Sequence, residues 1–134
     1  MPRHAASVIV LREREQGLEI LFVRRSPELK FMGGAWVFPG GSLSESDGEH
    51  HEDELAYRRC GIRETFEEAS IQLPDPRQLV PFSRWITPEL APIRFDTRFY
   101  LARDPEDGEP VPDGVEIDLA EWWTPAKALY LHMR

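Results

Sequence analysis

Short runs of apolar and β-branched residues, separated by polar turns, dominate the first third of the chain. Residues 5–11 are almost entirely apolar, which is typical of a strand buried on both faces. Residues 18–23 form a second run after a polar stretch that ends in Gly17, so we expect the two runs to pair as a hairpin. Residues 35–38 predict a short third strand, which Pro39-Gly40-Gly41 is expected to stop.

The apolar positions change to a helical spacing in the middle of the chain. Residues 42–53 are polar and acidic and predict a loop, after which Asp53 or Glu54 begins a helix. Apolar spacings of three and four residues mark one face of that helix, and Pro74 and Pro76 follow its end. We expect this face to pack on the core and the acidic side chains beside it to turn outward. The face consists of Leu55, Arg59, Ile62, Phe66 and Ala69.

The second half of the chain predicts further strands and a closing helix. Polar and apolar residues alternate over residues 94–99, which is typical of a half-buried strand. Thr124 and Pro125 suit an N-cap and a first helical residue, so a last helix begins near Ala126. Strands before and after one long helix predict an α/β (α+β) fold with a mixed sheet, in a single domain of residues 1–134. The expected strands are residues 79–86, 93–102 and 121–123, and residues 104–113 form an acidic loop.

Composition places the chain among globular proteins and narrows its partners. Hydrophobic residues make up 41% of the chain, which argues against global disorder. The net charge of −8 makes a poor surface for duplex nucleic acid, although a metal ion or a local basic patch still permits a small anionic substrate. No apolar run approaches the ~20 residues of a membrane helix, and the first residues leave no room for a signal peptide. Cys60 is the only cysteine, so we expect no internal disulfide and a cytoplasmic location.

The stretch RETFEEAS, residues 63–70, crowds three acids onto the predicted helix. Glu64, Glu67 and Glu68 stand at i, i+3 and i+4 and therefore share one face. Like charges at this spacing destabilise a helix by roughly 0.2–0.5 kcal/mol per pair. Either this face is solvated, or a cation sits on it.

Three segments together resemble the nudix hydrolase family: FPGG at residues 38–41, RETFEEASI at 63–71 and EWWTP at 121–125. The family box reads G-x5-E-x7-R-E-U-x-E-E-x-G-U, where U is an aliphatic residue. The resemblance implies the nudix fold, in which a mixed sheet is sandwiched between helices. The residues that match the box are Gly41, Arg63, Glu64, Glu67, Glu68 and Ile71.

The chain departs from the box in three ways. The first acid is Asp47, where the box has Glu. Residues 48–62 separate Asp47 from the Arg-Glu pair, where the box has only seven positions, so the polar stretch at about 42–53 carries an insertion. Thr65 and Ser70 stand where the box has an aliphatic residue and a glycine.

Residues 21–41 show a finer resemblance, to the coenzyme A diphosphatases of this family. They carry an Arg-Ser pair beginning at Arg25, Lys30 in place of the usual Arg, then Gly34 and the FPGG segment. The resemblance implies hydrolysis of the pyrophosphate bond of coenzyme A or acyl-coenzyme A. Two alternatives stay open. One is another nudix substrate, such as ADP-ribose, NADH or a nucleoside triphosphate; the other is a nudix-fold domain that binds without turnover.

The resemblance also assigns the metal site. Glu64, Glu67 and Glu68 are the expected ligands of Mg²⁺ or Mn²⁺, because carboxylate oxygens are the ligands that these ions prefer. Glu67 is also counted among the catalytic residues, together with Arg63. Arg63 fits an orienting role, in which it pairs with a ligand carboxylate and holds it in place.

The remaining assignments concern the base and the substrate. The expected general base is Glu109 or Glu116, although each could instead be one more acid of an acidic loop. The expected partner is a small-molecule diphosphate, with no nucleic acid and no membrane, and a homodimer is left open. The expected substrate-binding residues are Arg25, Lys30, Gly40 and Gly41.

Overall fold

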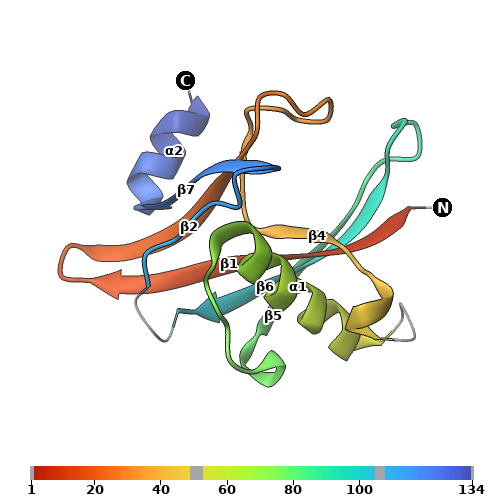
Figure 1. Ribbon diagram of the computed structural model, residues 1–134, viewed down its shortest axis with the longest axis horizontal. Coiled ribbons are helices and arrows are strands. Elements are labelled where there is room, and N and C mark those ends of the chain that lie inside the picture. Colours follow the sequence, from red (N-terminus) through yellow and green to blue (C-terminus); the bar gives the residue numbers. More distant parts are fainter. Residues whose placement is uncertain (1, 49–52, 105–107, 134) are drawn as a thin grey trace.

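The computed structural model describes residues 2–48, 53–104 and 108–133, and within them seven strands form one mixed sheet. The strand order is β3-β2-β1-β6-β5, with β4 added beside β1 and β7 beside β2. Helices α1 (Glu54–Ala69) and α2 (Pro125–Met133) pack on this sheet, which confirms the expected mixed fold (Figure 1). The strands are β1 (Arg3–Arg14), β2 (Gly17–Arg25), β3 (Trp36–Val37), β4 (Gly40–Ser42), β5 (Val80–Ile86), β6 (Phe95–Arg103) and β7 (Ile117–Trp123).

Strand β1 organises the sheet because three strands pair with it. It runs parallel to β6 and antiparallel to β2 and β4. The expected hairpin is confirmed, since Arg14 pairs with Gly17, whose φ of 119° favours glycine at the turn. Within β1, residues 11–14 pair with β2 and residues 5–7 pair with β4. The expectation that Pro39-Gly40-Gly41 stops the short strand is confirmed, because β3 ends at Val37. Gly40 and Gly41 themselves belong to the next strand, β4.

Helix α1 (green in Figure 1) lies across β1 and β4, but not with the expected face. Of the predicted apolar face only Ala69 is buried, whereas Phe66 is 51% exposed and Arg59 is exposed. Small residues instead allow a close approach, since a Cβ on Gly61 would lie 2.6 Å from Val8 Cγ2. The buried residues of α1 are Ala56, Tyr57, Cys60, Gly61, Thr65, Glu68 and Ala69.

The acids of α1 also differ from their expected orientation. Glu68 is only 5% exposed and the Glu64 side chain 16% exposed, so both turn inward, while Glu67 remains 54% exposed. Hydrophobic periodicity could not reveal this, because the packed face is made of small and acidic residues rather than large apolar ones.

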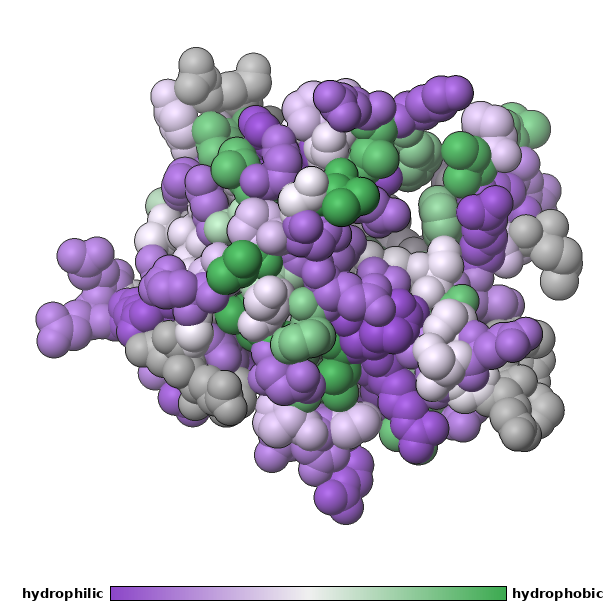
Figure 2. Space-filling model, in the orientation of Figure 1, coloured by the Kyte–Doolittle hydropathy of each residue, from purple (hydrophilic) through white to green (hydrophobic). Residues whose placement is uncertain are grey.

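The hydrophobic core lies between α1 and the sheet. The expected burial of the first strand is confirmed, because every residue from Ala5 to Val10 is buried. Figure 2 shows that one outer face of the molecule is largely hydrophilic, with only small separate hydrophobic patches. No helix among the described residues is long and apolar enough to cross a membrane. Core members from distant segments are Val8, Val10, Leu21, Val23, Tyr57, Cys60, Leu73, Leu79, Tyr100 and Ile117.

Several boundaries differ from the sequence predictions. Strand β7 begins at Ile117 rather than residue 121, whereas the end of α1 at Ala69, before the prolines, agrees with the prediction. The predicted loop at 42–53 contains the end of β4 and a 3₁₀ turn, Glu45–Asp47, and its residues 49–52 lie outside the described part. The predicted start of the last helix is confirmed, since the Lys127 N–H donates to Thr124 Oγ1 at 3.2 Å.

The two departures from the family box within α1 have structural explanations. Thr65 is fully buried at the aliphatic position, and its hydroxyl donates to the Gly61 carbonyl at 2.7 Å, which satisfies the polar group. Ser70 replaces the glycine at the end of the helix and adopts a left-handed conformation, with φ 59° and ψ 26°. Glycine avoids the steric cost of that conformation.

We therefore expect Ser70→Gly to raise the free energy of unfolding by about 1 kcal/mol. The substitution also removes the hydrogen bond that the Ser70 hydroxyl donates to the Val111 carbonyl. This bond is 3.3 Å long and exposed, so its loss offsets only a small part of the gain in stability. Urea denaturation measures the change. Ser83→Gly on the exposed strand β5 is the control and is expected to destabilise the protein, since glycine there only adds chain entropy to the unfolded state. An equal or lower stability for Ser70→Gly would contradict the prediction.

Candidate functional site

Strand β4 is joined to helix α1 by three consecutive contacts. The Gly40 N–H donates to Glu68 Oε1 at 2.9 Å, Cys60 Sγ donates to the Gly41 carbonyl at 3.4 Å, and Arg63 Nη2 donates to the Ser42 carbonyl at 3.1 Å. A Cβ on Gly41 would lie 2.6 Å from the Glu64 carboxyl carbon, so any larger residue would push this acid aside. The FPGG segment thus brings the backbone against the acidic part of the helix.

Asp47 takes the place of the first acid of the family box. Its carboxylate is bound in a two-pronged fashion by Arg63, with Nε–Oδ1 and Nη2–Oδ2 distances of 2.9 Å. The Ser44 N–H also donates to Asp47 Oδ2 at 2.9 Å, within the 3₁₀ turn. Burial alone would raise the pKa of Asp47, which is 2% exposed, but the bonds from Arg63 and Ser44 outweigh burial and lower it. The insertion therefore lies after Asp47 and leaves the acid–arginine pair intact.

The same arginine also reaches two of the acids on its own helix. Arg63 Nη1 donates to Glu64 Oε1 at 2.9 Å and lies 3.3 Å from Glu67 Oε2. Hydrogen bonding to Asp47 and the charges of Glu64 and Asp47 raise the pKa of Arg63, so it stays charged. Arg63 therefore contacts three carboxylates, those of Asp47, Glu64 and Glu67.

Two of the acids are held in an unfavourable environment. Burial, with added repulsion from Glu64 and Glu116, raises the pKa of Glu68 to about 8 despite the Gly40 N–H bond. Burial also raises the pKa of Glu64, and the charges of Glu67 and Glu116 add to that effect. Among the described residues, no three His, Cys, Asp or Glu side chains gather as a metal site. A cation between these carboxylates would relieve their repulsion and favour their ionised forms.

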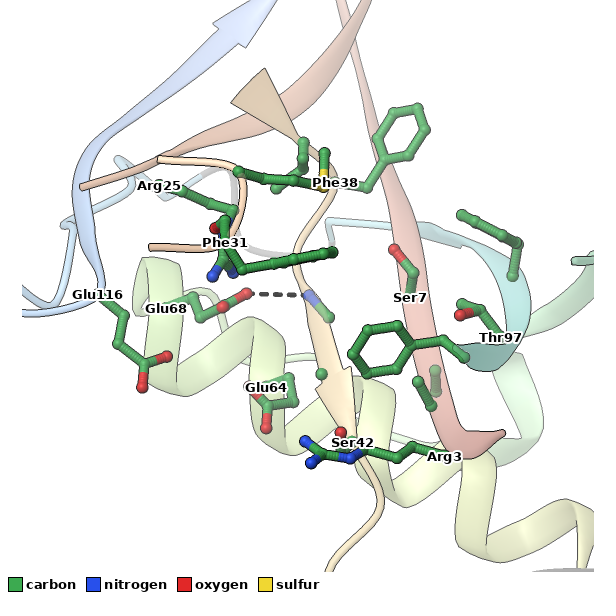
Figure 3. A pocket seen from close by; sticks show the side chains of 18 of the residues that line it. Arg3, Ser7, Arg25, Phe31, Phe38, Ser42, Glu64, Glu68, Thr97 and Glu116 are labelled. Carbon is green, nitrogen blue, oxygen red and sulfur yellow. Dashed lines mark hydrogen bonds between the residues drawn. The ribbon is translucent and has the colours of Figure 1, made fainter. Parts of the chain in front are cut away.

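A pocket of about 770 Å³ opens beside these acids, within the size range of small-molecule sites. Glu64, Glu68 and Glu116 line one side of it (Figure 3). The small residues Ala5 and Ser7 of β1 also line the pocket, and much of the remaining lining is aromatic. The aromatic residues lining the pocket are Phe22, Phe31, Trp36, Phe38, Phe95 and Phe99.

The structure separates the two candidates for the general base. Glu116 lies just before β7 and lines the pocket, and its charge acts on both Glu64 and Glu68. Glu109 does not line this pocket; its side chain is 82% exposed and lies 4.0 Å from Arg12 beside a different hollow. Sequence position could not separate them, since both lie in acidic stretches before the same strand.

The two basic candidates for substrate binding are separated as well. Arg25 lines the pocket, and its Nε donates to the Phe31 carbonyl at 3.1 Å. Lys30 is exposed and is not among the residues that line the pocket. Sequence analysis missed Arg3, Phe95 and Phe99. The alternation over residues 94–99 was a signal for Phe95 and Phe99, whereas the pairing of Arg3 with Phe95 is seen only in the structure.

Comparison with known proteins agrees with this geometry. The family model described as NUDIX domain matches residues 1–134. A probable nudix hydrolase of Schizosaccharomyces pombe is 38% identical over 68 residues, which cover 50% of this chain and 21% of that protein. The chain spans half or less of the length of the curated relatives it matches.

Solved structures show the same fold. A NUDIX hydrolase from Alicyclobacillus acidocaldarius is 27% identical with a TM-score of 0.84, over 99% of this chain and 83% of that one. The NUDIX domain of Shewanella oneidensis NrtR, solved in complex with ADP ribose, is 18% identical with a TM-score of 0.76, over 97% of this chain and 77% of that one. At that identity the second likeness concerns the fold alone. Because the family model covers the whole chain, the chain belongs to the NUDIX domain family.

Proposed function

We propose that the chain is a metal-dependent hydrolase that cleaves the pyrophosphate bond of a nucleoside diphosphate linked to another moiety. The observation that supports this most strongly is the crowding of Glu64, Glu68 and Glu116 along one side of a large pocket. Three carboxylates so placed are poorly suited to an anion on their own. They would suit a diphosphate if they held a divalent cation, which would supply the positive charge that the phosphates need.

The proposed ligands are Glu64, Glu67 and Glu68, whose hard oxygen atoms fit Mg²⁺ or Mn²⁺. The bound ion supplies positive charge to the phosphoryl oxygens and lowers the pKa of the attacking water. Arg63, itself fixed by Asp47, holds Glu64 and Glu67 in place through hydrogen bonds. Glu67 is exposed in the structure, so its proposed role as a ligand requires its side chain to turn toward the pocket.

The proposed general base is Glu116, which would take the proton from the attacking water. It lies on the same pocket as Glu64 and Glu68 but comes from the segment before β7 (Figure 3). Its position outside α1 leaves the carboxylates of the helix to the metal. Gly40 and Gly41 line the same pocket, and their proposed contribution is to expose the backbone of β4 beside the acids.

The finer proposal is that the substrate is coenzyme A or an acyl derivative. The resemblance in residues 21–41 supports it, as does a pocket whose aromatic side can hold an apolar or flat group. Arg25 lines this pocket and is the proposed contact for the 3′-phosphate, in place of Lys30. The alternatives are ADP-ribose, NADH or a nucleoside triphosphate as substrate, or a binding domain without turnover.

The proposal is tested by incubating the protein with Mg²⁺ and a panel of diphosphates and measuring the phosphate-ester products that are released. We expect wild type to cleave coenzyme A faster than ADP-ribose. Arg25→Ala is expected to slow coenzyme A hydrolysis by roughly tenfold to a hundredfold, the effect of one lost charge-assisted contact to phosphate. Dephospho-coenzyme A lacks the 3′-phosphate, so the rate of its hydrolysis should change much less.

Lys30→Ala is the matched control, because it removes a positive charge five residues after Arg25, in the turn that follows β2, without touching the pocket. An Arg25→Ala protein that slows on all substrates alike would sink the coenzyme A assignment, since a disturbed loop has that effect. Absence of turnover on every diphosphate would favour the binding-domain alternative and sink the hydrolase proposal.

A further inference from the structure

One arginine of the pocket has no role in the site described above. Arg3 is the first residue of β1, and it lines the pocket together with Glu64 and Glu68. Its backbone N–H donates to the Arg94 carbonyl at 3.0 Å, and it pairs in register with Phe95. These contacts fix its backbone on the sheet, so the side chain starts from a defined position.

The Arg3 side chain reaches the pocket from β1. Ala5 and Ser7, the next two residues on the same face of the strand, also line the pocket, as does Ala6 between them. Figure 3 shows the Arg3 side chain extending from β1 toward Ser42, closer to Glu64 than to Glu68 or Glu116.

Arg3 also differs from most arginines of the chain in its partners. Arg24 and Arg84, for example, bind Asp118 and Asp96 in two-pronged pairs, and Arg63 binds Asp47. Within residues 2–48, 53–104 and 108–133, the Arg3 guanidinium has neither an ion pair nor a hydrogen bond. Its donors are therefore available to an oxyanion in the pocket.

We propose that Arg3 binds a phosphoryl oxygen of the substrate diphosphate and so positions the diphosphate beside Glu64 and Glu68. This inference rests on the proposed function. Arg25 lies on the Glu68 side in Figure 3 and Arg3 on the Glu64 side, so two arginines bracket the acids. Because the diphosphate is common to every substrate of the proposed class, the contribution of Arg3 is independent of the attached group.

The test is Arg3→Gln, assayed with Mg²⁺ on coenzyme A, dephospho-coenzyme A and ADP-ribose. We expect kcat/KM to fall by roughly tenfold to a hundredfold on each substrate that wild type cleaves, mainly through KM. Arg3→Lys should recover part of the loss, since it keeps the charge but not the planar fork. The affinity for a methylene-bridged diphosphate, which cannot be hydrolysed, should weaken by a similar factor.

Arg103→Gln is the matched control, because it removes one exposed charge from the far end of β6, outside the pocket. It is expected to leave kinetics and analogue binding unchanged. Unchanged KM and analogue affinity in Arg3→Gln, with an active wild type, would overturn the role of Arg3 and leave the proposed function standing. A loss confined to coenzyme A would also overturn it, because the contact would then belong to the 3′-phosphate. If wild type cleaves no diphosphate, the proposed function fails, and an analogue affinity that Arg3→Gln still weakens would keep Arg3 as a phosphate contact.

Discussion

Replacing Glu68 by Gln is expected to lower Mg²⁺-dependent kcat/KM by at least about a hundredfold, because the proposed metal site loses a buried charge. The amide keeps the shape of the side chain and can still accept the bond from the Gly40 N–H, so the fold is expected to persist. Steady-state kinetics at saturating Mg²⁺, with circular dichroism of both proteins, measure the two effects. Turnover within a few-fold of wild type would remove Glu68 from the proposed ligand set.

The same substitution has a second readout in the metal-free protein. The pKa of Glu68 is about 8 in the folded state and near 4.5 in an unfolded chain. A raised carboxyl pKa contributes stability that is fully present below the unfolded pKa and is lost as pH rises through the folded pKa. We therefore expect the Tm of wild type in EDTA to fall as pH rises from about 5 to about 8. The Tm of Glu68→Gln should fall less steeply with pH. The pH dependence that remains belongs partly to Glu64, whose pKa is also raised.

Glu67→Gln is the matched control for that readout. Glu67 is 54% exposed and acts on the buried acids only through its effect on Glu64, so its replacement should change the pH dependence of Tm less than Glu68→Gln does. As a proposed ligand and catalytic residue, it should nevertheless reduce turnover strongly. Equal pH profiles for wild type and Glu68→Gln would show that Glu68 is not the group whose ionisation weakens the metal-free fold.

Replacing Asp47 by Asn is expected to lower the free energy of unfolding by about 3 kcal/mol, the low end for breaking a buried ion pair. The carboxylate is 2% exposed and accepts both prongs of Arg63, so an amide would place donors against the guanidinium. For a chain of this length, the Tm should fall by roughly 10 °C. Activity should fall by roughly tenfold to a hundredfold, since Arg63 would no longer be fixed beside Glu64 and Glu67. Thermal unfolding and kcat/KM check the two effects.

Asp75→Asn is the comparison, because Asp75 makes a similar two-pronged pair with Arg77, whose side chain is 88% exposed. Surface pairs contribute about 0–1 kcal/mol, and Asp75 lies far from the acids in sequence and outside the pocket. Activity should therefore be unchanged. Similar losses of stability in the two variants would contradict the special position given to Asp47.

The acid motif and the strands could be predicted because their signals are local. Spacing alone put Glu64 and Glu68 on one side of a helix, and the apolar run at residues 5–11 is the central strand β1. The Thr124-Pro125 start of α2 is equally local, because an N-cap acts on the next few N–H groups. Each of these features depends on residues that are close together in the sequence.

The face by which α1 packs could not be read from the sequence in the same way. Its contact with β1 depends on Gly61 fitting against Val8, which is a fit between two surfaces rather than a periodicity. The stripe containing Phe66 looked like the core face because large apolar residues dominate hydrophobic patterns. The orientation of the acids followed from this packing, and with it their burial and raised pKa values.

The sequence by itself determined the helix that carries Glu64, Glu67 and Glu68, the Arg63 beside them, and the family to which they point. Only the tertiary structure decided which distant residues join them. It seats Asp47 on Arg63 across the insertion, brings Glu116 rather than Glu109 to the pocket, and adds Arg3 from the first strand. These choices depend on how loops and strand ends meet around one cavity, and side chains separated by many residues in the chain leave no periodic mark of such a meeting.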